Sequence, residues 1–342
     1  MKKWENGNNI TEKRNSTSKP LCIIFAFILS IPLTVVIAFF LLKNSKADAS
    51  DVEAFFTSLR VIGHRGSPEN LPENTLDSFQ QALLDGVDGI EFDISLTRDG
   101  FPILMHDDSL DRMTNMTGPI SSKTLAELED CYVGIDFNRT GPSNRTVVPS
   151  RIPELEDLIK LVQPSKVRLI FDMKDDNEKL VETISGMFRK HGLYNRSVIA
   201  SFSPSVLYSF KRADPKFITV LIFRDRFYST WYYEGIHDQR PRSKGLWQRC
   251  LELGDWLNMV AINGFLPSFL GVDGLMGYNK NINELWVQEQ RDRGLHVLAW
   301  TVNELPEMLW MQEKLQVPFL TDRSYEIARL GRIAADINKT YA

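Results

Sequence analysis

The sequence has few cysteines and no excess of positive charge. Its 342 residues include three cysteines, Cys22, Cys131 and Cys250, which excludes a disulfide framework and any thiolate metal cluster of recognisable spacing. The sequence leaves open whether Cys131 and Cys250 pair. The formal net charge is -4, and no basic stripe with interleaved aromatic residues occurs. Nucleic acid is therefore not an expected partner.

Internal repeats and low-complexity tracts are also missing. Hydrophobic residues make up 43% of the chain, which excludes a disordered protein and is enough for a sizeable core. The length permits one large α/β domain or two ordinary ones.

One long hydrophobic run lies near the N-terminus. Residues 21–42 (LCIIFAFILSIPLTVVIAFFLL) contain no charged side chain, and a helix of about 20 such residues spans a hydrocarbon core of about 30 Å. We expect an uncleaved transmembrane helix at residues 21–42. The alternative is a cleaved signal peptide, for which KADAS at 46–50 offers small residues, but such peptides have a shorter apolar core.

The flanking charges predict the orientation of this segment. Residues 1–20 carry more lysine and arginine than the other flank, where Lys43 and Lys46 precede the first acidic residues. The positive-inside rule predicts a cytosolic tail at residues 1–20 and a lumenal or extracellular location for the rest. Glycosylation triplets beyond the segment agree with that side. They begin at Asn115, Asn138, Asn144, Asn195 and Asn338.

After a short juxtamembrane linker at 43–57, strand-like runs alternate with amphipathic helical stretches. This alternation favours a single (β/α)₈ barrel domain at residues 58–335, with a doubly wound open sheet as the alternative. The expected strands, one more than a barrel needs, are Val61–Gly66, Gly89–Thr97, Phe101–Asp107, Val167–Lys174, Ser197–Phe202, Phe217–Phe223, Met259–Phe265, His296–Val302 and Phe319–Asp322. The expected helices are Thr75–Leu84, Glu154–Leu161, Asn177–Lys190, Pro204–Arg212, Asn281–Arg293 and Leu305–Gln312.

Two stretches interrupt the alternation. Residues 108–150, rich in serine, threonine, asparagine and glycine, indicate an insertion or long loop, and residues 225–250 cluster tryptophan, tyrosine and arginine. Long loops in a compact barrel often carry function. The apolar stretch Trp256–Val272 contains asparagines and a proline, which favours a buried strand and loop, with a second membrane span as the alternative.

Strongly polar residues stand at the C-terminal ends of several apolar strands, which is where (β/α)₈ barrels build active sites. Glu91 and Asp93 are two positions apart, so both carboxylates point to one face of a strand. Asp172 adds a third carboxylate from another strand. A hard divalent cation, Mg²⁺ or Ca²⁺, would relieve the repulsion between them. The alternative is a solvated or lysine-paired acidic face.

Two histidines and an arginine accompany these carboxylates. His64 and Arg65 follow the first strand, and His106 ends the run FPILMHD. Taken alone, a histidine at the end of a strand is more often a hydrogen-bonded structural residue than a catalytic one. Together, two imidazoles can serve as acid and base, while the planar guanidinium of Arg65 matches the oxygens of a phosphodiester.

The motifs HRG, PENT, EFDISLTRDGFPILMHD, FDMK, AWTVN and TDR follow one another in this order. In order and spacing the chain resembles the glycerophosphodiester phosphodiesterase family over nearly all of residues 60–330, and most closely resembles its membrane-anchored animal branch, which acts on glycerophosphoinositol. The resemblance implies a (β/α)₈ barrel, a divalent metal such as Mg²⁺ or Ca²⁺, and cleavage of a phosphodiester into a phosphomonoester and an alcohol.

The resemblance also implies roles for particular residues. His64 and His106 would be the acid/base pair, and Glu91, Asp93 and Asp172 the metal ligands. Asp172 stands where many members carry the glutamate of an E-x-K motif, one methylene longer. The implied phosphate and substrate contacts are Arg65, Lys174 and Trp300. Asp322 receives no functional role here, because a loop-fixing hydrogen bond explains it equally well.

Two other functions remain as alternatives. The first keeps the barrel but acts on lysophospholipids or N-acyl-glycerophosphoethanolamines in a phospholipase D-type reaction; a phosphatidylinositol-specific phospholipase C fits the motifs less well. The second is a membrane-anchored binding module for a signalling partner, which the sequence does not identify.

Overall fold

The computed structural model describes residues 35–135, 137–142, 144, 146–233 and 239–341. The chain divides into two compact units, Met1–Lys43 and Asn44–Ala342. In the first, residues 35–42 are helical. Most of the expected membrane helix at 21–42 lies outside the described residues. Within the described ranges, no helix combines the length and the apolar character needed to cross a membrane.

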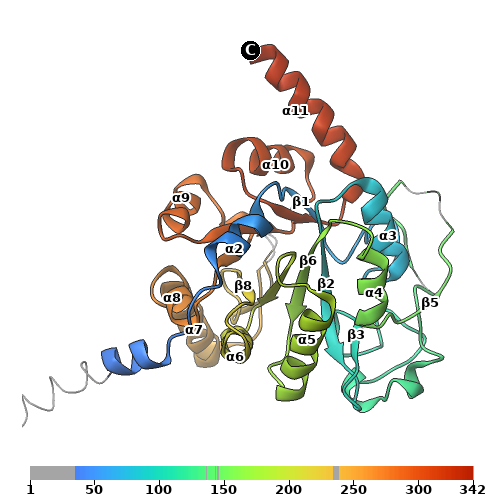
Figure 1. The fold of residues 1–342 in the computed structure, drawn as a ribbon, viewed down its shortest axis with the longest axis horizontal. Coiled ribbons are helices and arrows are strands. Elements are labelled where there is room, and N and C mark those ends of the chain that lie inside the picture. The colour runs from blue at the N-terminus through green and yellow to red at the C-terminus, as the bar shows by residue number, and fades with distance from the viewer. Residues whose placement is uncertain (1–34, 136, 143, 145, 234–238, 342) are drawn as a thin grey trace, which may run out of the picture. The chain divides into compact units, whose positions relative to one another are not determined.

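The second unit is built around a nine-stranded sheet in which every strand but one runs parallel to its neighbours. The sheet closes on itself because β1 pairs with both β13 and β2. Closure confirms the expected barrel over the open-sheet alternative (Figure 1). The parallel strands are β1 (Val61–Gly63), β2 (Gly89–Leu96), β6 (Arg168–Met173), β7 (Ser197–Ser201), β8 (Ile218–Phe223), β11 (Gly274–Tyr278), β12 (His296–Trp300) and β13 (Phe319–Thr321).

Continuous apolar runs explain why these strands line a buried barrel. In β8, all six residues of the run ITVLIF are buried, as expected for a parallel strand covered on both faces. The surrounding helices begin and end at capping residues: Thr75 caps α3, and Gly192 ends α5 with a φ of 64°. The helices are α3 (Leu76–Asp85), α4 (Leu155–Val162), α5 (Glu178–His191), α6 (Pro204–Ala213), α7 (Gly245–Asn263), α8 (Leu266–Leu270), α9 (Glu284–Asp292), α10 (Leu305–Leu309) and α11 (Ile327–Tyr341).

The prediction of a strand at Met259–Phe265 was wrong. Most of this stretch is the end of α7, and Trp256–Val272 as a whole forms the last turns of α7 and then α8. The missing barrel strand is β11, which begins at Gly274. A short apolar run does not distinguish a helix from a strand by periodicity alone. The sequence predicts nine strands, one more than the barrel needs. The extra strand is β3 (Pro102–Leu104), which pairs antiparallel with β2 outside the ring.

The expected linker at 43–57 contains a helix, α2 (Ala49–Phe56), whose N-cap is Asp48. Phe55 and Phe56 are buried in a cluster with interior residues of the barrel strands, including Ile62 and Ile170. Residues 44–47 are also attached to the barrel, since the backbone nitrogen of Ala47 donates to Asp273 Oδ1 at 3.0 Å. This helix therefore closes the end of the barrel opposite the strand C-termini.

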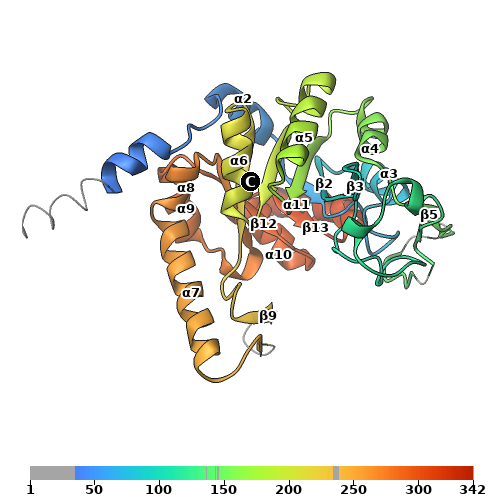
Figure 2. The same ribbon diagram turned by 90° about the horizontal axis from the view of Figure 1, so that it is seen from below.

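Two insertions extend the barrel. Residues 108–150 form a long loop with the short strand pair β4 (Tyr132–Val133) and β5 (Ser150–Arg151), packed on a small core of its own. The second insertion comprises the hairpin β9 (Thr230–Tyr233) and β10 (Gln239–Pro241), followed by α7. Figure 2 shows β9 beside α7, which projects beyond the barrel strands.

The two described cysteines are not paired. Cys131 is buried in the core of the first insertion, Cys250 is exposed on α7, and both are free thiols. The pairing that the sequence left open is therefore absent.

Candidate active site

The barrel brings the predicted site residues together at the C-terminal ends of its strands. Asp93 and Lys174 lie 3.1 Å apart (Asp93 Oδ1 to Lys174 Nζ), and Asp93 Oδ2 lies 3.3 Å from Arg65 Nε. These contacts place the pair against the wall of a cavity of about 320 Å³. The other predicted residues line this cavity directly: His64, Arg65, Glu91, His106, Asp172 and Trp300.

Two buried carboxylates and one half-buried carboxylate form an acidic cluster in the site. Glu91, Asp93 and Asp172 each offer one oxygen, and these oxygens lie within 4.8 Å of one another. Burial raises the pKa of Glu91 and of Asp172, and the charge of Asp93 raises both further. Burial acts upward on Asp93 as well, but Arg65 and Lys174 outweigh it and hold its pKa below the ordinary value. The cluster thus has more negative charge than its protein neighbours neutralise.

The cluster fits a divalent metal ion. Asp172 Oδ1 is buried and has no hydrogen-bond partner, although buried polar atoms are normally paired. The donor set consists of carboxylate oxygens from two adjacent strands, where Asp93 and Asp172 are register partners. Hard cations such as Mg²⁺ and Ca²⁺ prefer these donors.

The turn after β1 contacts two carboxylates of the acidic cluster. Arg65 and Asn74 adopt left-handed backbone conformations, with φ of 54° and 57°. The Arg65 backbone nitrogen donates to Glu91 Oε2 at 2.9 Å, and Asn74 Nδ2 donates to Asp93 Oδ2 at 2.8 Å. Non-glycine residues in this region carry strain that surrounding contacts must offset. Here the turn orients two carboxylates.

His64 is held by a residue to which the sequence gave no role. Its Nδ1 lies 2.7 Å from Asp322 Oδ1, and Asn303 Nδ2 donates to the other Asp322 oxygen at 2.7 Å. Burial and Arg65 lower the pKa of His64, but Asp322 and Glu91 outweigh them and the net pKa is raised. The hydrogen bond at Nδ1 leaves Nε2 directed toward Glu91 Oε2, 4.0 Å away.

His106 is positioned by a chain of charged groups that reaches into the first insertion. Its Nδ1 lies 2.7 Å from Asp107 Oδ1. Arg112 Nε donates to Asp107 Oδ2 at 2.6 Å, and Arg112 Nη2 donates to Glu73 Oε1 at 2.7 Å. Glu73 also accepts from Arg65 at 3.0 Å. Arg112 therefore links the surroundings of His106 and Arg65, and sequence analysis missed it.

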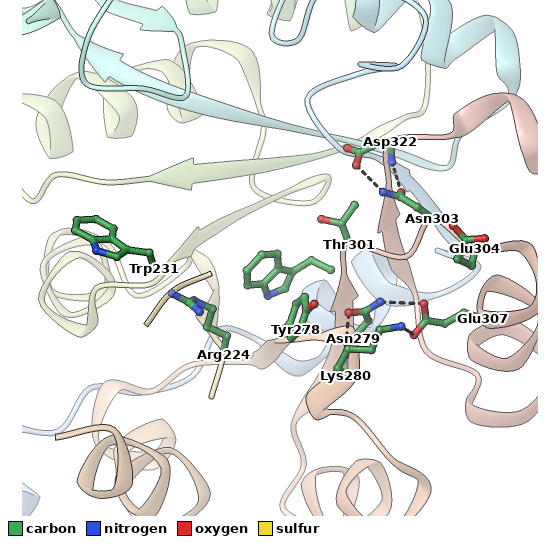
Figure 3. A pocket seen from close by; sticks show the side chains of 11 residues that line it. Arg224, Trp231, Tyr278, Asn279, Lys280, Thr301, Asn303, Glu304, Glu307 and Asp322 are labelled. Atoms are coloured by element: carbon green, nitrogen blue, oxygen red, sulfur yellow. Dashed lines mark hydrogen bonds and ion pairs between the residues drawn. The ribbon is translucent and has the colours of Figure 1, made fainter. Parts of the chain in front are cut away.

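A second cavity of about 520 Å³ adjoins the first and shares Arg224, Trp231 and Trp300 with it. Figure 3 shows Asn279, Lys280 and Glu307 on one side of this cavity and Asp322 on another. Its wall is polar and internally paired, with Asn279 Nδ2 and Lys280 Nζ each 2.9 Å from a Glu307 oxygen. The two cavities give room for a substrate longer than a phosphate group.

The arrangement has the parts of a phosphate-ester hydrolase. Two imidazoles, His64 and His106, line the same cavity, and the cationic side chains of Arg65 and Lys174 both contact Asp93 of the acidic cluster. Imidazoles transfer protons near neutral pH, and fixed cations stabilise developing phosphoryl charge.

Comparison with known proteins decides the family. The model of the glycerophosphoryl diester phosphodiesterase family matches residues 64–326. The chain belongs to this family. As a glycerophosphodiester phosphodiesterase it is a phosphoric diester hydrolase, and the predicted resemblance is confirmed.

Curated relatives of this phosphodiesterase include mammalian proteins. It is 28% identical to "Glycerophosphodiester phosphodiesterase 1" of Bos taurus over 269 residues, covering 78% of both chains. The Homo sapiens protein of the same name is 28% identical over 271 residues, covering 78% of this chain and 79% of its own.

Solved structures share the fold. The glycerophosphoryl diester phosphodiesterase of Silicibacter pomeroyi matches with a TM-score of 0.61 and 24% identity, over 82% of this chain and 94% of that one. An Oleispira antarctica phosphodiesterase in complex with the product sn-glycerol-3-phosphate matches with a TM-score of 0.60 and 22% identity, over 81% and 98%.

Proposed function

We propose that this phosphodiesterase hydrolyses glycerophosphodiesters such as glycerophosphoinositol to a phosphomonoester and an alcohol, with a divalent metal, Mg²⁺ or Ca²⁺, as cofactor. The observation that carries the proposal is the placement of two histidines beside three clustered carboxylates in one cavity. The Oleispira antarctica phosphodiesterase, solved in complex with the product sn-glycerol-3-phosphate, supports the same class of substrate.

The two imidazoles would move protons on opposite sides of the phosphorus. One of His64 and His106 takes a proton from the attacking water, whose oxygen forms the new P–O bond. The other gives a proton to the alcohol oxygen as the old P–O bond breaks. Asp322 and Asp107 each hold a ring through Nδ1, which presents Nε2 to the substrate. Because one imidazole acts as base and the other as acid, the reaction requires both His64 and His106.

Charge stabilisation would come from the neighbouring cationic side chains. Arg65 and Lys174 orient the phosphate oxygens and lower the energy of the charge that develops on them. Glu91, Asp93 and Asp172 would hold the cation, which supplies Lewis-acid polarisation of the phosphate when bound. Trp300 borders both cavities, so its indole would separate the phosphate from the remainder of the substrate.

The adjoining cavity supports a hydroxylated leaving alcohol. Its amide, lysine and carboxylate groups, Asn279, Lys280 and Glu307 among them, offer donors and acceptors for several hydroxyl groups. Inositol has this character, whereas a simple apolar chain does not.

We also propose the membrane topology predicted from the sequence: a cytosolic tail at residues 1–20, a transmembrane helix at residues 21–42, and a lumenal or extracellular barrel that can be glycosylated. Support comes from the uncharged run and the flanking charges.

A lysophospholipase D-type reaction is the second candidate. One observation favours it: Trp231, which lines both cavities, is 62% exposed and stands on the same insertion as α7, whose outer side is apolar. An acyl chain leaving the cavities could lie against such a surface.

The test is hydrolysis by the purified full chain of glycerophosphoinositol, other glycerophosphodiesters and a lysophospholipid, with Mg²⁺, Ca²⁺ or chelator. We expect metal-dependent turnover that His64→Ala and His106→Ala each reduce by a factor of about 100 or more. His191→Ala is the matched control, because this histidine pairs with Glu156 away from the site. Wild-type rates in both site variants, with the proteins folded, would refute the proposed roles.

A further inference from the structure

The long helix α7 presents an apolar side outward. Leu246, Leu253, Trp256, Leu257 and Val260 are between 51% and 81% exposed, and their spacing places them on one side of a helix. We call these five residues the α7 apolar face. Isolated exposed leucines are ordinary, but a contiguous stripe of this kind marks a contact surface.

The opposite side of α7 is fixed to the barrel. Asp255 is buried and accepts from the backbone nitrogens of Tyr228 and Ser229 at 2.6 and 3.0 Å. Gln248 Nε2 donates to the Ser229 carbonyl at 3.1 Å, and Ile262 is buried. The helix therefore cannot turn its apolar face inward without breaking these contacts.

The surroundings of the α7 apolar face are basic and aromatic. Residues 240–251 contain four lysines and arginines and no acidic residue. Trp231 and Trp247 are 62% and 65% exposed, and the guanidinium of Arg242 lies 4.5 Å from the Trp231 ring centre. Apolar side chains flanked by tryptophan and basic residues are typical of helices that lie in the interfacial region of a bilayer with anionic lipids.

The surface is also next to the catalytic cavities. Arg224 and Trp231 line both cavities, and Arg224 Nη2 donates to the carbonyl of Thr230 at the start of β9. A molecule or a membrane that contacts this insertion therefore lies beside the entrance to the active site.

We propose that the α7 apolar face, with Trp231 and Trp247, inserts into the interfacial region of a phospholipid bilayer and thereby places the entrance of the active site at the lipid surface. The inference rests on the proposed membrane anchor. That segment ends at residue 42, and the barrel unit begins at Asn44, so an inserted chain keeps the barrel next to the bilayer. The basic flank matches anionic headgroups, which favours lipid over a protein occupant.

The test uses the full chain in phosphatidylcholine–phosphatidylserine vesicles. Cys250 lies on α7 as an exposed free thiol, and a nitroxide attached to it reports local access to oxygen and to a water-soluble nickel chelate. Cys22→Ser in the same chain removes the thiol of residues 21–42. We expect high oxygen and low nickel access, as for a side chain about 5–10 Å below the headgroups.

The control label is placed at Leu84→Cys in the same background with Cys250→Ser. Leu84 is 69% exposed on α3, and α3 connects β1 to β2, across the ring of strands from the β8–β11 connection that contains α7. We expect this label to report water. A Cys250 label as accessible to nickel as the Leu84→Cys label would overturn the proposal.

A double variant, Leu253→Glu with Leu257→Glu, distinguishes insertion of the α7 apolar face from membrane attachment through residues 21–42 and from hydrolysis. We expect the lipid-exposed fraction of the Cys250 label to fall by about tenfold or more per leucine. Flotation with vesicles, which reports the anchor, and hydrolysis of a water-soluble diester, which reports the proposed function, should stay unchanged. Shielding from both reagents with spin–spin broadening would identify a second copy instead and refute the bilayer as occupant.

Discussion

Asp172 lies in an electrostatically unfavourable position when no cation is bound. It is a half-buried carboxylate next to two others, its pKa is raised by burial and by Asp93, and one of its oxygens has no hydrogen-bond partner. A carboxylate in this position opposes folding of the metal-free protein and favours binding of a cation. Its contribution to stability therefore depends on whether the metal is bound.

Asp172→Asn should have opposite effects with and without metal. In chelator we expect a higher melting temperature than wild type, because a buried negative charge is removed while the shape of the side chain is kept. With Mg²⁺ or Ca²⁺ we expect metal affinity to fall by about tenfold or more, and the metal-induced rise in melting temperature to shrink. Thermal unfolding against metal concentration measures both.

Asp172→Glu is the matched control, since it keeps the charge and lengthens the side chain by one methylene. It should retain the metal-induced rise in melting temperature. A variant Asp172→Asn that responds to metal as wild type does would show that Asp172 is not a ligand.

At the residue scale, sequence analysis found the groups that stand at strand ends and missed those that orient them. The predicted carboxylates and His64 converge because parallel strands end at one side of a barrel, and His106 returns to that side after the antiparallel strand β3. The catalytic roles of these residues stay predictions. Asp322 was set aside because nothing local shows that a residue 258 positions away, His64, is its partner. Only closure of the ring between β13 and β1 brings them together.

At the scale of elements, the first insertion contacts residues of the candidate active site. Residues 108–150 surround a small apolar core, and Arg112 extends from this insertion to Asp107 and Glu73. The pKa of Asp107 is about 2, because Arg112 and His106 outweigh the upward effect of burial. The insertion thus fixes the charged carboxylate that orients His106.

Arg112→Ala should lower kcat by about tenfold or more with a smaller change in KM, since the side chain positions His106 and Arg65 without lining the catalytic cavity. Arg112→Lys should recover part of the loss. Steady-state kinetics with the soluble diester measure both. Arg98→Ala is the control, because Arg98 pairs with Glu127 at the surface of the same insertion. Equal kinetics for Arg112→Ala and Arg98→Ala would contradict a positioning role.

Most elements were predictable, and the exception has a physical cause. Regular alternation of strands and amphipathic helices located every barrel strand except β11. The long helix α7 combines buried residues such as Ile262 with exposed apolar ones such as Leu257, so its sequence lacks the polar face that identifies a surface helix. The strand prediction at Met259–Phe265 failed where an apolar surface replaced that polar face.

At the scale of the whole molecule, the barrel depends on residues before its first strand. Phe55 is fully buried on α2 among interior residues of the barrel. Phe55→Ala should lower the free energy of unfolding by about 3–5 kcal/mol, whereas Phe101→Ala, at a phenylalanine that is 45% exposed, should change it little. Chemical denaturation measures the difference, and similar values for the two variants would show that α2 is a dispensable linker.

The contacts of this N-terminal segment also set the order of events during synthesis. Ala47 donates to Asp273, 226 positions later, Lys46 donates to the Gly294 carbonyl, 248 positions later, and the ring of Phe56 stacks on His296 at 4.0 Å. At about 5–20 residues per second, a ribosome takes on the order of ten seconds or more to supply these partners. During that interval the phenylalanines of α2 remain without their native neighbours. The ribosome therefore synthesises α2 long before the residues that this helix and its flank contact. We expect the nascent chain to require chaperone protection until the final strands are translated.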